Sequence, residues 1–486
     1  MIKSNFSKFL AIGLVSFLFA CNNDDNTTDD TRILSNDYVT PLIKPSGFYI
    51  VNEDWFGHDN GTVNFIDQSY NPFYRVYREN NPGKKFGVTT ASATAYGDYY
   101  YFISKQQNRL VVTDKNLKEV LTLEDINGDG RAFVGATKSK GYISTSKGIT
   151  VFDIDNLKID KTLAGINTQI GNMAVINNKL YAVGSNNTLY IIDINTDNIL
   201  KQYTDKYSQL TIDGKGIVWV GNGDHLLKIN PFNNDEMNNI PISGTSIQGQ
   251  WGAWNAGSLT ASTDGKYVYW NANGGAWNGG NTIAQFDVEN NTLNPNFYKL
   301  GQDENVMLEF YGAGMRIDPH TNNLVLTVKR KGWGSNGSYN LVQIIDKNGG
   351  LVKNIKLLGV NDESTSYNPD GGYFWFPAQP LFEDNNAPQI TANQFIAKTN
   401  TENRIVLKDF VIDQDSPFNL IQFKVSSRNA DLAQIDIEQE LVGSDNNELE
   451  KHLVIKTNNT RGITHISIEA VSNGKSVTKE IQLIVQ

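Results

Sequence analysis

Short apolar runs and polar loops alternate between Phe48 and Leu358, and the same arrangement recurs seven times. In each repeat, a first β run is followed by a polar loop and then by a second β run that ends at Asp or Asn. The second runs end at Asp67, Asp114, Asp153, Asp193, Asn230, Asp287 and Asp346. Hairpins rich in Val, Ile and Tyr that recur about every 40 to 45 residues are typical of a β-propeller. The pattern therefore predicts an all-β fold with a seven-bladed propeller over residues 46–384.

The two remaining strands of each blade can be predicted as well. An outer strand follows each repeat, as in Lys118–Leu123 and Leu351–Leu357, and an inner strand precedes each hairpin. The first repeat lacks its inner strand, because Pro45 to Gly47 lead directly into Phe48. We expect the segment Gly372–Ala378, after the seventh hairpin, to supply that strand and close the ring. Closure removes the open sheet edges that favour aggregation.

Residues 385–486 follow a different pattern. Asn385-Asn-Ala-Pro388 ends the repeats, and six short β runs follow at Arg404–Leu407, Leu420–Val425, Ala433–Ile437, Leu453–Lys456, Thr464–Ile468 and Lys479–Val485. This spacing favours an immunoglobulin-like or cadherin-like β-sandwich without a disulfide. Asp413, Asp415 and Asp445 are possible calcium ligands, although isolated acidic loops are more often merely solvated. We expect a spacer or docking domain.

The pattern of residues 1–20 predicts a signal peptide. Lys3 and Lys8 precede an apolar stretch, Phe9–Ala20, that is too short to span about 30 Å of hydrocarbon. The tetrapeptide Leu18-Phe-Ala-Cys21 resembles the bacterial lipoprotein box. Cys21 is also the only cysteine in 486 residues, so the sequence favours acylation at Cys21. The alternative is a cleaved secretory peptide with an incidental cysteine.

Residues 21–45 predict a disordered tether, because the run Asn22–Asp30 is acidic and too poor in apolar residues to fold. This run also resembles the acidic export signal of surface lipoproteins of the Bacteroidetes; a plain linker is the alternative. The resemblance implies a lipid-anchored protein on the outer membrane, exposed at the cell surface. Acyl chains contribute about 0.8 kcal/mol for each buried CH₂, so several chains make such an anchor effectively permanent.

Charge and motif patterns argue against several classes of function. The net charge is −10 and no basic stripe is present, which argues against a nucleic-acid partner. The five histidines, His58, His225, His320, His452 and His465, lack the close spacing of zinc sites. The run Asp125–Gly130 matches half of a calcium loop, but position twelve is Ala136, so a turn is expected. No catalytic or dinucleotide motif occurs in a suitable context, and we expect a protein that is not an enzyme and holds no metal or cofactor.

The tryptophans point to a binding surface. Six of the eight lie outside the first β runs, at Trp55, Trp251, Trp254, Trp277, Trp333 and Trp375. In a propeller, the loops that join second to third strands open on the same face as those that join blades. Exposed aromatic side chains gathered on one face usually mark an interaction surface. The alternative is packing around the axis, which is more probable for Trp254 and Trp375 than for the others.

Two segments carry a resemblance to a known family: Val51–Val63 and Tyr373–Ala378. With the lipoprotein box and the repeats, they make residues 47–388 similar to the Bacteroidetes surface-exposed propeller lipoproteins, the YncE-like proteins and the BtuG-type cobalamin-binding family. The resemblance implies capture of cobalamin or another corrinoid, as a bound ligand rather than a cofactor, and its delivery to a TonB-dependent outer-membrane transporter.

The candidate ligand-binding residues are aromatic and polar side chains of the loop face. They are Trp55, Phe56, His58, Lys105, Gln107, Arg109, Gln250, Trp251, Trp254, Trp277, Asn278, Arg330, Trp333, Tyr339 and Trp375. A glycan would need nearly the same residue types, because sugar rings stack on Trp and hydroxyls pair with amides. A glycan-binding lipoprotein is therefore the main alternative, and a propeller glycan lyase or hydrolase is a further one.

Overall fold

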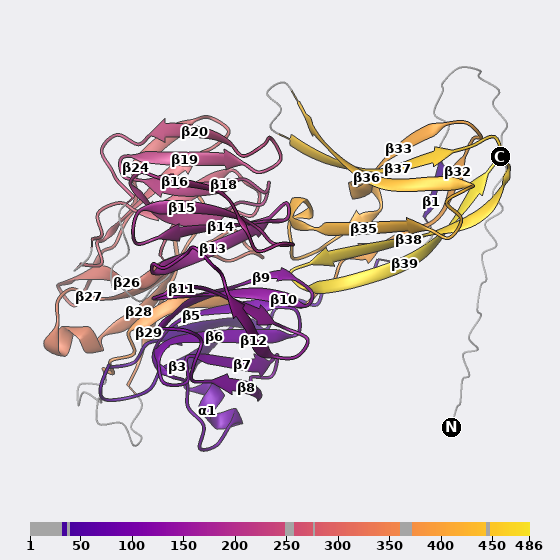
Figure 1. Ribbon diagram of the computed structural model, residues 1–486. Coiled ribbons are helices and arrows are strands. Elements are labelled where there is room, and N and C mark those ends of the chain that lie inside the picture. The colour runs from indigo at the N-terminus through magenta and orange to yellow at the C-terminus, as the bar shows by residue number, and fades with distance from the viewer. Residues whose placement is uncertain (1–31, 36–38, 248–256, 276–277, 360–371, 444–447) are drawn as a thin grey trace, which may run out of the picture.

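The computed structural model describes residues 32–35, 39–247, 257–275, 278–359, 372–443 and 448–486. The described chain is almost entirely β-structure, arranged as a ring of sheets beside a second group of sheets (Figure 1). Short helical segments occur at α1 (Val76–Asn80), η1 (Gly334–Ser338), η2 (Leu407–Asp409) and η3 (Phe418–Leu420). Among these described segments, no helix combines the length and the apolar character needed to cross a bilayer.

The sheets of the ring share one strand order, and their strands fall into four positions. The first strands are β30 (Pro377–Phe382), β5 (Val88–Tyr96), β9 (Gly130–Thr137), β13 (Ile170–Ile176), β17 (Tyr207–Ile212), β21 (Thr260–Ala261) and β26 (Val306–Ile317). The second strands are β2 (Gly47–Asn52), β6 (Tyr99–Gln106), β10 (Lys140–Thr145), β14 (Lys179–Gly184), β18 (Val218–Asn222), β22 (Tyr267–Asn271) and β27 (Leu324–Arg330).

The third and fourth strands complete each sheet towards its outer edge. The third strands are β3 (Thr62–Asp67), β7 (Leu110–Asp114), β11 (Gly148–Asp153), β15 (Thr188–Asp193), β19 (His225–Asn230), β23 (Thr282–Asp287) and β28 (Asn340–Ile345). The fourth are β4 (Pro72–Phe73), β8 (Glu119–Leu123), β12 (Lys158–Thr162), β16 (Ile199–Thr204), β20 (Glu236–Pro241), β24 (Thr292–Lys299) and β29 (Leu351–Leu357), and β25 (Gln302–Asp303) adds to β26. The predicted hairpins coincide with the pairs of second and third strands.

The ring closes through a strand from the end of the repeats. Each first strand lies beside the next, and β26 lies beside β30. Strand β30 pairs antiparallel with β2, from Phe48 opposite Phe382 to Asn52 opposite Pro377. The predicted closure is confirmed, but the closing strand is Pro377–Phe382 rather than Gly372–Ala378. Phe376 has a left-handed backbone with φ of 45°, which interrupts the extended conformation just before β30.

Continuous apolar runs in the second strands follow from burial on both faces. In β2, Tyr49 and Val51 pack into a cluster with Phe102 of β6. Phe48 and Ile50 pack into a different cluster on the other side. Successive side chains of a strand point to opposite faces, so β2 joins the two neighbouring sheets.

The second group of sheets is a β-sandwich, called the sandwich below. One sheet has the order β1 (Arg32–Ser35), β32 (Ala392–Ala397), β39 (Lys475–Val485), β38 (Gly462–Ser472) and β35 (Gln422–Ser427). The other has β33 (Glu402–Val406), β37 (Glu448–Thr457) and β36 (Ala433–Val442), and β31 (Gln389–Ile390) pairs with β34 (Val411–Ile412). Residues of both sheets, including Phe395, Leu453, Ile468 and Leu483, share one buried core. Strands β1, β31, β32 and β34 were not predicted.

Strand β1 is an exception to the expected tether. Residues 32–35 lie inside the segment 21–45, yet they pair antiparallel with β32. The Thr40 and Ile43 amides then donate to side chains of Gln389 (2.6 Å) and Asn386 (2.9 Å). Arg32-Ile-Leu-Ser35 carries two adjacent branched apolar residues, and pairing covers the edge of β32 that would otherwise be open.

The sandwich docks on one end of the ring. Gly97 donates its amide to Asn473 O (2.8 Å), and Asn473 Nδ2 donates to Ala95 O (3.2 Å). Gln422 and Asn419 donate to the carbonyl oxygens of Ala136 (3.3 Å) and Lys215 (3.2 Å). Ala95 and Ala136 lie near the ends of first strands, so the sandwich covers the end of the ring at which these strands finish.

Candidate functional site

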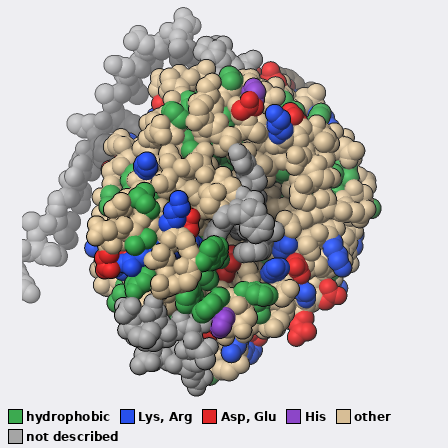
Figure 2. Space-filling view, turned by 90° about the vertical axis from the view of Figure 1, so that its left-hand side faces the viewer, with side chains coloured by type: hydrophobic (Ala, Val, Ile, Leu, Met, Phe, Trp, Pro, Cys, Tyr) green, Lys and Arg blue, Asp and Glu red, His purple; other side chains and the backbone are tan. Residues whose placement is uncertain are grey.

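The candidate loops lie at the end of the ring away from the sandwich. Second strands run antiparallel to first strands, so the loops that follow them open at the opposite end from the sandwich contacts. Figure 2 looks onto this end, the loop face, and shows hydrophobic side chains gathered there among scattered Lys and Arg. Three segments meet on it: residues 53–61 between β2 and β3, residues 331–339 between β27 and β28, and residues 373–376 before β30.

These three segments build a continuous row of aromatic rings, called the aromatic wall below. His58 stacks on Trp55 with ring centres 3.8 Å apart, and Trp55 lies 4.2 Å from Phe374. Phe374 lies 5.7 Å from Phe376, which in turn lies 6.1 Å from Trp333. All four separations permit ring–ring contact. The wall therefore crosses the junction between the first and last sheets of the ring.

The outermost aromatic rings are open to solvent. Trp333 is 63% exposed and Phe56, next to Trp55, is 57% exposed. Large aromatic side chains are rarely left exposed together in a soluble protein unless they contact a ligand or a partner. This end of the ring therefore has the properties of a binding surface.

The backbone beneath the wall is held in an unusual conformation. Glu53 donates its amide to Phe376 O (3.0 Å), and Asp54 donates to Trp375 O (2.9 Å). Asp54 and Phe376 both have left-handed backbones, with φ of 53° and 45°. Such conformations cost about 1 to 3 kcal/mol in residues other than glycine and cluster at functional sites. Two strained residues joined across neighbouring segments support the assignment of this end as the site.

Buried acidic groups lie directly behind the wall. Tyr311 donates its hydroxyl to Glu53 Oε2 (2.9 Å), and its ring stacks on Phe376 at 4.9 Å. Thr62 donates to Asp54 Oδ2 (2.6 Å), while Asp54 Oδ1 is buried without a hydrogen-bond partner in the described structure. Burial raises the pKa of Asp54 to about 8, so this carboxyl is mostly protonated at neutral pH. These groups are 1–3% exposed and brace the wall rather than face solvent.

A buried ion pair supports Trp333. Lys329 Nζ donates to Glu309 Oε1 (2.5 Å) and to Gly332 O (2.7 Å), and it lies 4.8 Å from the centre of the Trp333 ring. The Gly332 amide donates to the same Glu309 oxygen (3.2 Å). The Trp333 ring is thus held in place by a fixed cation.

Polar residues from the neighbouring sheet border the wall. Lys105 Nζ lies 5.7 Å from the centre of the Phe56 ring, and Asn60 donates to Gln107 Oε1 (3.2 Å). Arg109 turns to its own sheet instead, donating to Glu124 O (2.7 Å) and lying 3.6 Å from Asp129. Lys105 and Gln107 can therefore contact a ligand on the wall, whereas Arg109 is occupied in holding its loop.

Two predicted contact residues have structural roles. Arg330 is 6% exposed, pairs with Asp303 and Glu304 at 2.7 Å, and lies 3.7 Å from the Tyr339 ring centre. Trp375 is completely buried between Tyr373 and Tyr74, with ring centres at 4.4 and 5.3 Å. Both side chains are therefore engaged in contacts within the protein itself.

The remaining predicted residues fall elsewhere. Asn278 is exposed, and its side-chain oxygen accepts from the Gly280 amide (3.2 Å) within the β22–β23 loop. Gln250, Trp251, Trp254 and Trp277 lie outside the described residues. The wall also contains Phe374 and Phe376, which were not among the candidates. This segment turns rather than running extended, since the Trp375 amide donates to Tyr373 O (2.8 Å). Phe374 is partly exposed, whereas Tyr373, Trp375 and Phe376 are buried.

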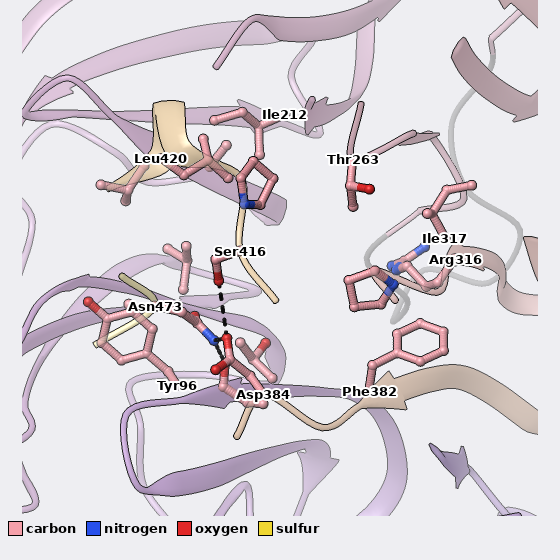
Figure 3. A pocket seen from close by; sticks show the side chains of 18 of the residues that line it. Tyr96, Ile212, Thr263, Arg316, Ile317, Phe382, Asp384, Ser416, Leu420 and Asn473 are labelled. Carbon is pink, nitrogen blue, oxygen red and sulfur yellow. Dashed lines mark hydrogen bonds between the residues drawn. The ribbon is translucent and has the colours of Figure 1, made fainter. Parts of the chain in front are cut away.

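A separate cavity of about 490 Å³ lies on the axis of the ring at the sandwich end (Figure 3). Every first strand contributes to its lining, and Ser416, Asn473 and Gly474 of the sandwich border it. Arg316 lines this cavity and donates through Nη1 to the carbonyl oxygens of Gly257 (2.8 Å) and Met315 (2.7 Å). In the described parts of the chain, no cluster of three or more His, Cys, Asp or Glu side chains is arranged to hold a metal ion.

Solved structures are similar to this chain at low sequence identity, and the first match below supports the propeller-like fold. A quinoprotein alcohol dehydrogenase-like protein from Bacteroides thetaiotaomicron matches with a TM-score of 0.52 at 14% identity, over 70% of this chain and 79% of that one. The extracellular domain of a one-component system protein from the same organism matches with a TM-score of 0.41 at 12% identity, over 90% of this chain and 62% of that one. A WD40 β-propeller domain matches at 15% identity with a TM-score of 0.33, over 43% and 67% of the two chains.

Sequence comparison identifies a family for this chain. No curated protein matches the chain. Residues 46–383, which include the whole ring and the aromatic wall, match the family described as a domain of unknown function, DUF5074. The chain therefore belongs to the DUF5074 family.

Proposed function

We propose that this protein is a surface lipoprotein that captures a corrinoid on the aromatic wall and passes it to a TonB-dependent outer-membrane transporter. In this proposal the sheets of the ring are the blades of a seven-bladed propeller, the sandwich is an immunoglobulin-like spacer, and Cys21 carries the lipid. The observation that carries the proposal is the aromatic wall itself, which runs from His58 to the exposed Trp333 and has polar groups at its border.

The chemistry of the wall suits a broad and rigid ligand. A corrinoid is a wide macrocycle fringed with amides, so its face can lie on aromatic rings while its edge pairs with side chains such as Lys105 and Gln107. A rigid ligand on a wall braced by buried groups loses little conformational entropy on binding. This mode of binding needs no bond to cobalt and no acid–base catalyst. A glycan would use the same stacking and is the alternative ligand.

Calorimetric titration with cyanocobalamin and, separately, with oligosaccharides tests the ligand. We expect heat with cyanocobalamin, and we expect Trp333→Ala to weaken binding by about 2 kcal/mol or more, roughly thirtyfold. Phe73→Ala is the matched control, because Phe73 is 50% exposed but lies on the outer strand β4. Absence of heat and of spectral change well into the micromolar range would exclude the corrinoid. Heat with oligosaccharides alone would support the glycan alternative.

The rival activity is cleavage of glycans. Incubating the purified protein with a panel of polysaccharides and measuring new reducing or unsaturated ends separates capture from catalysis. Capture predicts no turnover. Reproducible turnover that is lost in a wall variant would instead assign the protein as an enzyme.

The lipid anchor is tested by one substitution. We expect Cys21→Ala to move the mature protein from the membrane fraction to the soluble fraction, because the acyl chains supply the membrane affinity. Fractionation followed by immunoblotting measures the change, and Ser4→Ala, in the signal segment, is the control. If the Cys21 variant stays in the membrane fraction to the same extent, the proposed anchor is wrong.

A further inference from the structure

A group of buried oxygen atoms lies where the chain passes from the ring into the sandwich. Asp413 and Asp415 occupy the turn between β34 and η3, and Ser472 ends β38. Asp413 Oδ2, Asp415 Oδ1 and Ser472 Oγ are all buried and form no hydrogen bond of normal geometry in the described structure, although the Asp413 carboxyl lies against the side chains of both Asp415 and Ser472. Ser472 is only 2% exposed. Leaving buried polar atoms unsatisfied costs about 1 to 3 kcal/mol each, so three together require an explanation.

The other oxygens of the two carboxylates are fully engaged. Asp413 Oδ1 accepts from the Asp415 and Ser416 amides at 3.2 and 3.0 Å. Asp415 Oδ2 accepts from the Asn385 and Asn386 amides at 3.1 and 3.0 Å, and from Asn386 Nδ2 at 2.7 Å. These bonds fix both side chains in place. The carboxylates cannot turn away from one another without breaking several hydrogen bonds.

Among the described residues, no Lys or Arg forms an ion pair with either Asp413 or Asp415. Lys475 lies at the same junction, but its ammonium is paired with Asp384. Asp384 also accepts from Ser416 (3.5 Å) and from Asn473 (2.5 Å), as Figure 3 shows. Two like charges held together in a partly buried turn repel each other, and a bound cation would remove that repulsion.

We propose that Asp413, Asp415 and Ser472 bind a divalent cation of the Ca²⁺ type at the junction of ring and sandwich. The donors are all oxygens, which suit hard cations and disfavour zinc and copper. Two carboxylates and a hydroxyl leave further positions of Ca²⁺ to backbone carbonyls and water. Asp415 and Ser472 also line the axial cavity, which gives the ion a path of entry.

The consequence of binding is a stiffer junction. Asp415 ties residues 385–386, which connect β30 of the ring to β31 of the sandwich, while Ser472 precedes the Asn473–Gly474 turn that docks on Tyr96 and Gly97. An ion bound by both Asp415 and Ser472 links the connecting segment, residues 385–386, to the docking turn, Asn473–Gly474. The orientation of the sandwich on the ring is then set by Ca²⁺.

The test is Ca²⁺ binding by the full mature chain after treatment with EDTA. Calorimetry is expected to detect one Ca²⁺ for each chain, and thermal unfolding of the sandwich is expected to shift up by about 5 °C at tenfold excess over Kd. Without Ca²⁺, Asp413→Asn should be as stable as the wild type or more so, because it removes the repulsion, and it should lose the Ca²⁺ response. Ser472→Ala should weaken Ca²⁺ binding while keeping the repulsion.

Asp436→Asn is the matched control, because Asp436 is an exposed aspartate of the same domain. It should keep the full response to Ca²⁺. Equal responses of Asp413→Asn and the wild type would overturn the proposal, as would the absence of heat and of a thermal shift at about 10 mM Ca²⁺, above the range of weak extracellular sites. A proton shared between Asp413 and Asp415 would give this second result. None of these outcomes depends on the ligand of the aromatic wall.

Discussion

Replacing Trp375 with alanine is expected to lower the free energy of unfolding by about 3 to 5 kcal/mol. The side chain is completely buried, stacks on Tyr74 with an angle of 12° between the rings, and donates through Nε1 to Leu358 O (3.0 Å). The variant therefore creates a cavity and removes the hydrogen bond to the Leu358 carbonyl. Denaturant unfolding followed by fluorescence and circular dichroism measures the loss.

Trp333→Ala is the comparison that separates packing from binding. Its side chain is 63% exposed, so the free energy of unfolding should change by no more than about 0.5 kcal/mol. Trp375→Ala is thus expected to lower the free energy of unfolding, whereas Trp333→Ala is expected to lower the affinity for the ligand. If Trp375→Ala left stability unchanged, the buried position of this side chain would be contradicted.

The ring could be predicted from the sequence because the pattern of each hairpin lies within a short stretch of the chain. Each hairpin joins two apolar runs across one polar loop, and burial on both faces of a strand such as β2 makes these runs continuous. The closing strand was found for the same reason, since Pro45 and Gly47 leave the first sheet one strand short. Its bounds were less accurate because they depend on the backbone of Phe376, which composition does not reveal.

The candidate site was only partly readable. Trp55, Phe56 and Trp333 lie in polar, glycine-containing loops. Aromatic residues in such loops indicate a binding surface. In the run from Tyr373 to Phe376, Trp375 was chosen by residue type, whereas its burial depends on a local backbone turn that residue type does not reveal. The ion pairs of Arg330 were not predictable from a local pattern, because Asp303 and Glu304 lie 26 to 27 positions earlier in the chain.

Contacts between ring and sandwich were not predictable at all. They are made by backbone groups at Ala95, Gly97 and Ala136 and by amide side chains such as Asn473. Asn and Gln are common throughout this sequence, so no pattern distinguishes those that dock. Strand β1 was not predicted either. A run of only four residues forms a strand only when the edge of a sheet is available for pairing, and the sequence does not show that edge.

Breaking the ion pair below Trp333 is expected to have the second large effect. Lys329 has no exposed side-chain surface, and Glu309 is its acidic partner. Glu309→Ala leaves a buried ammonium whose charge is no longer compensated, which costs about 3 to 5 kcal/mol in the free energy of unfolding. Denaturant unfolding measures this loss, and the wild-type circular dichroism spectrum checks that the variant is folded before denaturant is added.

The double variant Lys329→Met, Glu309→Leu distinguishes charge from shape. Replacing both members of a buried pair by apolar residues of similar size is often neutral, so most of the stability should return. Ligand affinity should stay reduced, because the Gly332 amide and carbonyl lose the bonds that fix the loop and Trp333 loses the cation under its ring. Recovery of affinity together with stability would show instead that the ion pair acts only on the fold and that Trp333 is positioned by its other contacts.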